Sequence, residues 1–206
     1  MKSELITLKD ARVLVCELTD SVESLKEQIT LIESDNIEFE KIVSEKRKLE
    51  FLGIRVALKS LLGKEIKIQY DKEGKPHLLD GSYQISVSHT NNWIAVMAHP
   101  TQKVGIDIEC PTDKIRNLYT RFLSVTEQKE LSEGNDTRQL LLAWSAKEAL
   151  YKIIGKEAID FANQLRIFPF EVQSKGEMKA QHIPTQQLYQ LYYQQNEKYT
   201  LVYCLT

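Results

Sequence analysis

The sequence predicts an α+β fold made of two similar halves, each a small antiparallel sheet packed with helices. Short apolar runs separated by turn residues indicate strands and hairpins. Two longer segments, 38–62 and 138–154, are predicted to be helices that each end at a glycine. The order strand, helices, strands occurs once before and once after about residue 101. A chain of 206 residues corresponds to between one and two average domains, and we expect halves over 1–101 and 102–206.

The elements of the first half follow from local signals. Residues 11–18 are rich in Val and Leu and predict a strand, and Thr19, Asp20 and Ser21 can cap a helix over 22–29. A short strand is expected at 66–70, before a turn at 71–74. The runs 84–88 and 93–98 predict a hairpin with its turn at 89–92.

The elements of the second half follow in the same way. Residues 104–109 predict a strand that ends before Pro111, and 114–123 a helix. Ser124 and Glu127 fit a capping box for a further short helix. Asn135, Asp136 and Thr137 can cap the helix over 138–154. Strands are expected at 165–172, 188–194 and 199–205, the last two joined by a turn at 196–198.

Composition excludes several functional classes. The chain is 42% hydrophobic and 27% charged, which excludes a disordered polyelectrolyte. Its 27 Lys and Arg against 29 Asp and Glu give a net charge of −2, which disfavours nucleic-acid binding but leaves room for a local basic patch. The longest apolar run covers 93–98, far short of the ~20 residues of a membrane span. Three distant cysteines without a C-x-x-C pair indicate neither a disulfide framework nor a zinc site. We expect a cytoplasmic protein with no membrane or nucleic-acid partner.

The strand motif Val104-Gly105-Ile106-Asp107-Ile108-Glu109 carries the sharpest chemical signal. Asp107 and Glu109 share one face of the strand, about 7 Å apart, and two such carboxylates repel each other unless a cation or water separates them. Hard oxygen ligands suit Mg²⁺ or Mn²⁺. The alternative is a solvent-exposed polar face of an edge strand.

The helix motif Trp144-Ser145-Ala146-Lys147-Glu148-Ala149-Leu150-Tyr151-Lys152 is the second signal. Trp144, Glu148 and Lys152 lie in one i, i+4 stripe, and the opposite side of the helix is apolar. A helix that is apolar almost all round is usually buried, so the two charges need partners. The alternative is an ordinary surface ion pair between Glu148 and Lys152.

Three further motifs could contact anions. Ser88 and His89 end a predicted strand, where a hydroxyl and backbone N–H groups can meet a phosphate. A Ser–His dyad for acyl transfer is conceivable, although no G-x-S-x-G elbow is present. Pro76 fixes the backbone after Lys75 on a turn. The basic run Lys46-Arg47-Lys48 lies on the first helix, with Arg55 two turns further along it. Each has a plain structural alternative: a structural histidine, a solvated turn lysine and a solvated helix face.

Taken together and in this order, the motifs GKPHL, ISVSHT, VGIDIE and WSAKEALYK resemble those of the 4'-phosphopantetheinyl transferases. They run from Gly74 to Lys152 and match the family pattern at every position. The length resembles the larger, surfactin-synthetase-activating (Sfp-like) branch, which implies a monomer of two pseudo-symmetric halves. The shorter holo-acyl-carrier-protein synthase branch has about half this length and forms trimers.

The resemblance implies an activity and a set of roles. Coenzyme A would lie between the halves, with the nucleotide held by the first half and the metal and catalytic helix in the second. Asp107 and Glu109 would hold Mg²⁺, with Glu148 as a third ligand or as the base. A serine hydroxyl of an apo acyl or peptidyl carrier protein would attack the phosphate next to the pantetheine arm, which releases adenosine 3',5'-bisphosphate.

The resemblance also implies contacts to coenzyme A. Lys152 would neutralise the pyrophosphate, and Ser88 and His89 would hold phosphate oxygens. Lys75, on its Pro76-fixed turn, and Arg47 would grip the nucleotide, with Arg55 as a further candidate. Asp107, Glu148 and Lys152 would form the catalytic group.

Two other functions remain open at this point. One is a non-catalytic module that binds a carrier protein or coenzyme A, and the other is a metal-dependent phosphohydrolase that uses the same carboxylates. The intact set of Asp107, Glu109, Glu148 and Lys152 argues against a degenerate binder, because a binder needs no metal.

Overall fold

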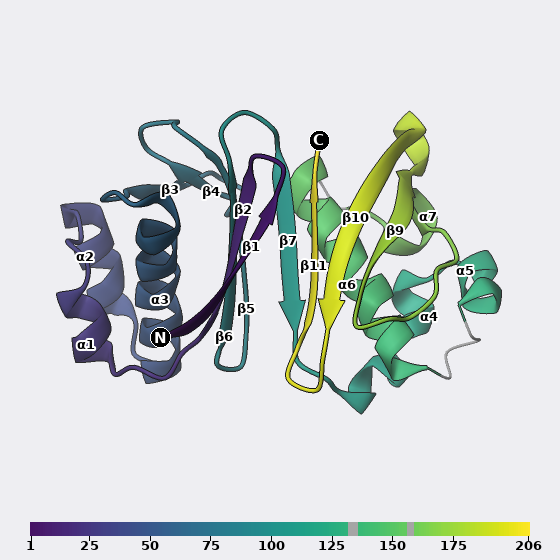
Figure 1. Cartoon of the computed structure of the whole chain (residues 1–206), viewed down its shortest axis with the longest axis horizontal. Helices are drawn as coiled ribbons and strands as arrows, with labels where there is room; N and C mark the ends of the chain where they lie inside the picture. The colour runs from purple at the N-terminus through teal and green to yellow at the C-terminus, as the bar shows by residue number, and fades with distance from the viewer. Residues whose placement is uncertain (132–135, 156–158) are drawn as a thin grey trace. The chain divides into compact units, whose positions relative to one another are not determined.

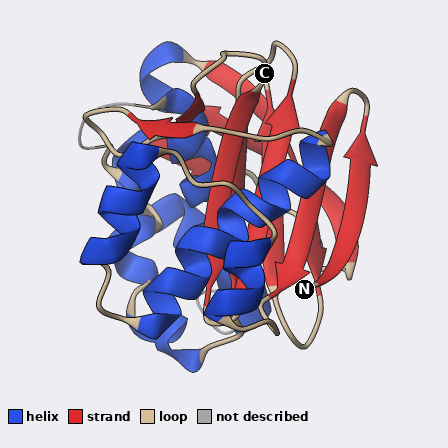
Figure 2. Ribbon diagram, turned by 90° about the vertical axis from the view of Figure 1, so that its left-hand side faces the viewer, coloured by secondary structure: helices blue, strands red, loops and turns tan. Residues whose placement is uncertain are grey.

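The computed structural model describes residues 1–131, 136–155 and 159–206, which form two compact units, Met1–Gln102 and Lys103–Thr206 (Figure 1). Each unit combines helices with an antiparallel sheet (Figure 2). The predicted α+β fold, with antiparallel sheets packed against helices, is therefore confirmed. Within the described part of the chain, no helix is both long and apolar enough to span a membrane.

The N-terminal unit contains a four-stranded antiparallel sheet in the order β1-β2-β6-β5 and a two-stranded ribbon of β3 and β4. The predicted hairpin is present as β5 and β6, with Val87 opposite Val96. The elements of this unit are β1 (Lys2–Leu8), β2 (Ala11–Glu17), α1 (Val22–Glu27), α2 (Glu33–Lys41), α3 (Glu45–Leu62), β3 (Ile68–Tyr70), β4 (Pro76–Leu78), β5 (Gln84–Thr90) and β6 (Trp93–His99).

Helix α3 packs on one face of this sheet (Figure 1). Gly53 allows the close approach, because a Cβ atom there would lie 2.5 Å from side-chain atoms of Ile94 and Leu18. Leu14, Leu58 and Ile94 belong to the core between helix and sheet. The core fixes which side of α3 is buried, and therefore where its polar residues point.

The single helix predicted over 38–62 is wrong, since the structure has two helices there, α2 and α3. The chain leaves the helical conformation at Ile42, and Val43 is 96% exposed. Ser44 then caps α3 by accepting a hydrogen bond from the backbone N–H of Arg47. A serine in a charged stretch can act as an N-cap, which propensity alone does not reveal.

The C-terminal unit contains, among its described residues, a five-stranded antiparallel sheet in the order β7-β11-β10-β9-β8. Helix α6 runs along the sheet next to β7 and β11 (Figure 1). The described elements are β7 (Val104–Glu109), the 3₁₀ helix η1 (Asp113–Asn117), α4 (Tyr119–Phe122), α5 (Val125–Glu130), α6 (Thr137–Ile154), α7 (Phe161–Gln164), β8 (Leu165–Ile167), β9 (Lys175–His182), the 3₁₀ helix η3 (Ile183–Thr185), β10 (Gln187–Gln195) and β11 (Thr200–Leu205).

Several sequence predictions for this unit are confirmed. Ser124 and Glu127 form the expected capping box of α5. Asp136 caps α6, which ends at Gly155, whereas Asn135 lies outside the described residues. Others need correction. The helix predicted over 114–123 is η1 followed by α4, and only 165–167 of the strand predicted over 165–172 are extended in the sheet.

Five of the described elements were not predicted: β1, β4, β9, α7 and the 3₁₀ helix η3. β1 and β9 have mostly exposed or half-exposed side chains, and their sequences KSELITL and KGEMKAQH lack a run of apolar residues. β4 and α7 span only three and four residues. Such strands exist because a neighbouring strand pairs with them, so their own composition signals them weakly.

A buried ion pair joins α6 to the helices and strand around it. The Nζ atom of Lys147 lies 2.8 Å from Oε1 of Glu127, and both side chains are fully buried. The same ammonium donates to the carbonyl oxygens of Phe122, Phe161 and Leu165 at 2.7–2.8 Å. Glu127 also accepts from the backbone N–H of Ile167 and Ser124. This network ties α4, α5, α7 and β8 to one turn of α6.

We predict that Lys147→Met lowers the free energy of unfolding by about 3–5 kcal/mol, because it leaves the buried Glu127 carboxylate without its cation. Urea denaturation measures this loss. Adding Glu127→Gln should recover part of it, since a neutral amide replaces the stranded charge. Lys129→Met, at an exposed position of α5, should stay within about 0.5 kcal/mol of wild type. A loss below about 1 kcal/mol for Lys147→Met would contradict this role.

Candidate active site

The candidate residues of the C-terminal unit are brought together by the close packing of β7 on α6. Gly105 makes this possible, because a Cβ atom at this position would overlap the carbonyl oxygen of Ala149 and contact Ile153. Gly105, Asp107 and Glu109 lie on the same face of the strand. The contact at Gly105 therefore turns the two carboxylates toward α6.

Two side chains of α6 meet these two carboxylates. Nζ of Lys152 lies 3.0 Å from Oδ1 of Asp107 and donates to the carbonyl oxygen of Ile106 at 2.7 Å. Nε1 of Trp144 donates to Oε1 of Glu109 at 3.1 Å. Strand and helix thus run antiparallel, and the stripe predicted on α6 faces the carboxylates predicted on β7.

Glu148 lies between these two contacts along α6 and is half-buried. Its pKa is raised to about 7, mainly by burial and next by the charge of Asp107, with a smaller increase from Glu109 and an opposing effect of Lys152. Because charges act at short range in a protein, these influences place Glu148 in one electrostatic cluster with the three other candidates. A carboxyl group with this pKa changes its charge near neutral pH.

The geometry decides between the structural alternatives for this unit. Asp107 is only 4% exposed, so it does not lie on a solvated face, although β7 is an edge strand of its sheet. Lys152 reaches across to β7 and is held by Asp107 and a backbone carbonyl. It is therefore not half of an isolated surface pair with Glu148.

Three carboxylates of the C-terminal unit are candidate ligands of a divalent cation. In the described ranges, no three His, Cys, Asp or Glu side chains are arranged as a ready metal site. The oxygen donors of Asp107, Glu109 and Glu148 nevertheless have the chemistry that Mg²⁺ prefers. Burial and, after it, the charges of the other two carboxylates raise the pKa of Glu148. Mg²⁺ commonly uses one or two protein carboxylates and takes its other ligands from phosphates and water. The residues present therefore fit such an ion bound together with a phosphate substrate.

The remaining candidates lie in the N-terminal unit, where Glu50 connects two of them. Oε1 of Glu50 lies 3.4 Å from Nδ1 of His89, and Oε2 lies 3.6 Å from a guanidinium nitrogen of Arg47. Nζ of Lys46 lies 3.9 Å from the same carboxylate, which is buried. The structure thus gathers His89 and the basic first turn of α3 around one acidic side chain. Ser88 points to the opposite face of β5 from His89, which argues against a Ser–His dyad.

Arg55 does not join this group. It is 2% exposed, and its guanidinium group binds both carboxylate oxygens of Asp35 at 2.7 and 3.1 Å. It also donates to the carbonyl oxygen of Phe51 and stacks on the Phe51 ring. The expectation that Arg55 grips the nucleotide is therefore wrong, because the side chain is committed to joining α2 to α3.

Lys75 follows a well-fixed turn and directly precedes β4, which begins at Pro76. Oδ1 of Asp71 accepts from the backbone N–H groups of Glu73 and Lys75, and Oδ2 lies 3.0 Å from Nε2 of His77. Gly74 supplies the left-handed conformation that the turn requires, with φ of 79°. The backbone that presents Lys75 is therefore held by Asp71.

Sequence reasoning missed the residues that support these candidates. The supporting residues are Glu50, Asp71 and the pair Lys147–Glu127. Each of them contacts a candidate residue or fixes the element that carries one. Asp71 could have been found, because an aspartate that opens a turn commonly caps it. The pairing of Glu127 with Lys147 and that of Glu50 with His89 show no signal in the sequence, since tertiary packing brings these partners together.

Comparison with known proteins adds independent information. Residues 103–204 match the family model of the 4'-phosphopantetheinyl transferase superfamily. The chain is 29% identical over 129 residues to a phosphopantetheinyl transferase of Thraustochytrium sp., an alignment that covers 53% of this chain and 44% of that protein. It is 30% identical over 96 residues to the 4'-phosphopantetheinyl transferase Sfp of Bacillus subtilis, with 45% of this chain and 42% of that protein covered. The alignments thus span less than half of each relative's own length.

We predict a pH-dependent stability that depends on Glu148. Its pKa is about 7 in the folded protein against an ordinary 4.5, so folding favours the protonated form. The stabilisation is fully present below about pH 4.5 and is lost as the pH rises through 7. We compare the unfolding free energies of Glu148→Gln and wild type in metal-free buffer. The value for the variant minus that for wild type should increase by about 2 kcal/mol between pH 4.5 and 7.5, a figure that allows for the partial exposure of Glu148.

Urea denaturation across this pH range measures the difference. Glu171→Gln, at an exposed position, serves as the control and should leave the profile unchanged. Parallel profiles for wild type and Glu148→Gln would contradict the raised pKa.

Proposed function

Through residues 103–204 the chain belongs to the 4'-phosphopantetheinyl transferase superfamily, and from this premise we propose that it transfers the 4'-phosphopantetheine arm of coenzyme A to a serine of an apo acyl or peptidyl carrier protein. Adenosine 3',5'-bisphosphate is the second product. The observation that carries the proposal is the β7–α6 contact, which joins Asp107 to Lys152 and Glu109 to Trp144 beside Glu148. This arrangement assembles acid, base and cation at one place.

Glu148 is the group best suited to accept a proton. With a pKa of about 7 it is partly ionised at neutral pH, and its basicity is far greater than that of an ordinary glutamate. It can take the proton of the attacking serine hydroxyl, or it can serve as a metal ligand. Both roles require its ionised form.

Magnesium, or manganese in its place, would be held by Asp107 and Glu109, with Glu148 as a third ligand. When bound, the ion supplies positive charge that stabilises the leaving phosphate oxygens. Lys152 would also stabilise the charge of the phosphates, from its position beside Asp107. Its ammonium group is fixed by Asp107 and the carbonyl oxygen of Ile106, so a pyrophosphate placed there meets a cation that is already oriented.

The N-terminal unit would bind the nucleotide. Arg47, Lys75 and His89 supply cationic or hydrogen-bonding groups for phosphate oxygens, and Ser88 supplies a hydroxyl. Pro76 restricts the backbone after Lys75, and Asp71 fixes the turn before it. We propose that residues 1–101 grip coenzyme A and that 102–206 carry the chemistry. We further propose a cytoplasmic monomer that acts on neither nucleic acid nor membranes.

We predict that incubation with coenzyme A, Mg²⁺ and an apo carrier protein adds about 340 Da to the carrier, as measured by mass spectrometry. EDTA should abolish the gain and Mg²⁺ should restore it, and a carrier whose acceptor serine is changed to alanine should gain nothing. A non-catalytic binder would leave the carrier mass unchanged, and a phosphohydrolase would degrade coenzyme A without modifying the carrier. Full transfer in metal-free buffer would overturn the metal role.

We predict that Glu148→Gln lowers kcat by about 100-fold or more, because the amide can neither accept the proton nor bind a cation strongly. The two roles of Glu148, as base and as metal ligand, can be distinguished by adding Mg²⁺ to the variant. High Mg²⁺ should partly restore a weakened metal site but should not replace a missing base. The decrease is measured by steady-state kinetics, and Glu171→Gln is the matched control. Near wild-type kcat for Glu148→Gln would remove it from the chemistry.

We predict that Lys75→Ala and His89→Ala weaken the binding of coenzyme A, measured by isothermal titration calorimetry. Dephospho-coenzyme A lacks the 3'-phosphate and distinguishes the two sites of contact. A residue that serves the 3'-phosphate loses its effect with this analogue, and one that serves the pyrophosphate keeps it. Unchanged affinity of Lys75→Ala for both ligands would make Lys75 an ordinary turn lysine.

A further inference from the structure

Trp144 belongs to the stripe of α6 that faces β7 but has no assigned part in the transfer reaction. Its indole group is half-buried, packs on the core of the C-terminal unit and donates from Nε1 to Oε1 of Glu109 at 3.1 Å. The indole N–H is a hydrogen-bond donor only. A phenylalanine would give similar packing, so the N–H group is the distinctive contribution of Trp144.

Two phenylalanine rings hold the indole ring in place. The ring of Phe122 on α4 meets it edge-on, with the ring centroids 5.2 Å apart and an interplanar angle of 66°. The ring of Phe161 on α7 lies 5.7 Å from it at an angle of 44°. Such offset and edge-on contacts are the geometries that aromatic pairs prefer. Because rings from two elements contact the indole, the direction of its N–H group is fixed.

Lys147 holds the backbone of both phenylalanines. It lies three residues after Trp144 on α6, and its ammonium group donates to the carbonyl oxygens of Phe122 and Phe161, both at 2.8 Å. The same ammonium group forms the buried ion pair with Glu127. The ion pair therefore fixes the two residues whose rings contact Trp144, in addition to its effect on the position of α6.

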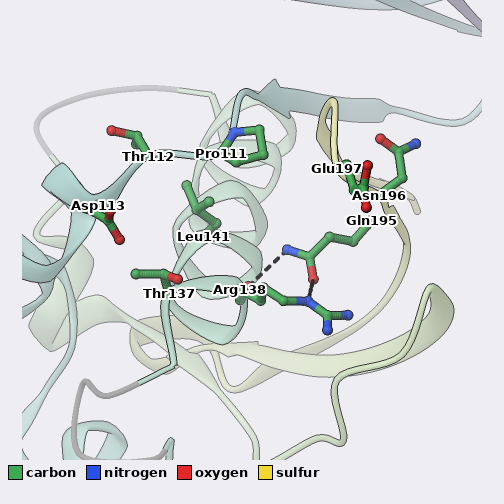
Figure 3. A pocket seen from close by; sticks show the side chains of 9 residues that line it. All are labelled: Pro111, Thr112, Asp113, Thr137, Arg138, Leu141, Gln195, Asn196 and Glu197. Carbon is green, nitrogen blue, oxygen red and sulfur yellow. Dashed lines mark hydrogen bonds between the residues drawn. The ribbon is translucent and has the colours of Figure 1, made fainter.

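Helix α6 is also anchored before Trp144. Nε of Arg138 donates to Oε1 of Gln195, and Nε2 of Gln195 donates to the carbonyl oxygen of Arg138, both at 3.1 Å (Figure 3). These paired bonds attach the first turn of α6 to the last residue of β10, in the wall of a cavity. The helix is thus held on both sides of Trp144, which keeps the indole group beside Glu109.

A neutral donor suits a carboxylate that is to bind a cation. Asp107 is paired with the ammonium group of Lys152 at 3.0 Å, and a positive charge so close offsets part of its negative charge. The indole N–H of Trp144 orients Glu109 but adds no positive charge beside it. Glu109 is the half-exposed last residue of β7. A long side chain at such a position loses conformational freedom when it binds a ligand, unless a partner already holds it.

We propose that Trp144 is a positioning residue, whose Nε1–H group orients Glu109 for the divalent cation of the transfer reaction while Phe122 and Phe161 hold the indole. The inference rests on the proposed function, which places a cation at Asp107 and Glu109. Loss of a hydrogen-bonded partner that orients a metal ligand typically lowers metal affinity about 10–100-fold. Loss of the indole N–H should therefore weaken the binding of the cation and not the chemical step.

The test removes the N–H group and keeps an aromatic ring. The probe is Mn²⁺, whose free concentration is measured by electron paramagnetic resonance in the presence of saturating coenzyme A. Trp144→Phe should raise the Kd of Mn²⁺ about 10-fold, and the Mg²⁺ concentration for half-maximal transfer should rise by a similar factor. The kcat at saturating Mg²⁺ should change less than about twofold. Trp93→Phe, which removes the other tryptophan, on β6, is the control and should match wild type.

A double-mutant cycle separates positioning from packing. In a Glu109→Ala background the indole has no carboxylate to orient, so adding Trp144→Phe should change the Kd of Mn²⁺ less than about twofold. Phe161→Leu loosens the indole without removing its N–H group. It should raise the Kd several-fold in the wild-type background and leave it unchanged in the Trp144→Phe background. Urea denaturation shows whether Trp144→Phe is folded, and if it is not, Phe161→Leu alone decides: an unchanged Kd would overturn the proposal.

A Kd of Mn²⁺ that is equal in Trp144→Phe and wild type would overturn the proposal. An equal loss of affinity with and without the Glu109 carboxylate would also overturn it, because Trp144 would then act through packing alone. Failure of the proposed function has a different result: the wild-type protein would bind neither coenzyme A nor Mn²⁺ and would modify no apo carrier. A wild-type protein that transfers the arm, together with a Trp144→Phe variant of normal Mn²⁺ affinity, would reject only the role of Trp144.

Discussion

The close approach of β7 and α6 at Gly105 is the constraint on which the candidate site depends. Any larger residue at this position would overlap the backbone of Ala149 and push the strand off the helix. The hydrogen bonds from Lys152 to Asp107 and from Trp144 to Glu109, at 3.0 and 3.1 Å, tolerate only small displacements. The absence of a side chain at Gly105 thus sets the distance between β7 and α6. At that distance, polar side chains of the strand contact polar side chains of the helix.

The position of α6 is in turn fixed by the buried pair of Lys147 and Glu127. Lys147 is adjacent to Glu148 in sequence, but its side chain points into the core, where one carboxylate and three backbone carbonyl groups surround the ammonium group. Consecutive helical residues point about 100° apart, so fixing Lys147 also fixes the direction of Glu148. A buried ion pair adds little net stability, but it is satisfied in only one arrangement. Here that arrangement keeps the half-exposed line of Trp144, Glu148 and Lys152 turned toward β7.

Local patterns in the sequence sufficed to predict β7, α6 and the candidate carboxylates, because period-2 and i, i+4 spacing decide which side chains share a face. These patterns failed for residues whose partners are determined by tertiary packing. Arg55 looked like a free cation on a basic helix, yet Asp35 on a separate helix binds it. Ser44 looked like one more polar residue of a long helix, yet it begins a new one. Glu50, with His89 and Arg47 around it, could not be found, since no spacing relates a position on α3 to one at the end of β5.

The charge balance of the site explains why Glu148 differs from its neighbours. Asp107 has Lys152 at 3.0 Å, and Glu109 accepts a hydrogen bond from the indole N–H of Trp144, so each of these two carboxylates has a polar partner. Glu148 is desolvated and faces both carboxylates, and of the three charged groups that influence its pKa only Lys152 favours its charge. Its proton is therefore held up to about pH 7, which limits the repulsion in the free protein. A cation or a cationic substrate group placed beside it would reverse this preference, so the protonation of Glu148 should follow occupancy of the site.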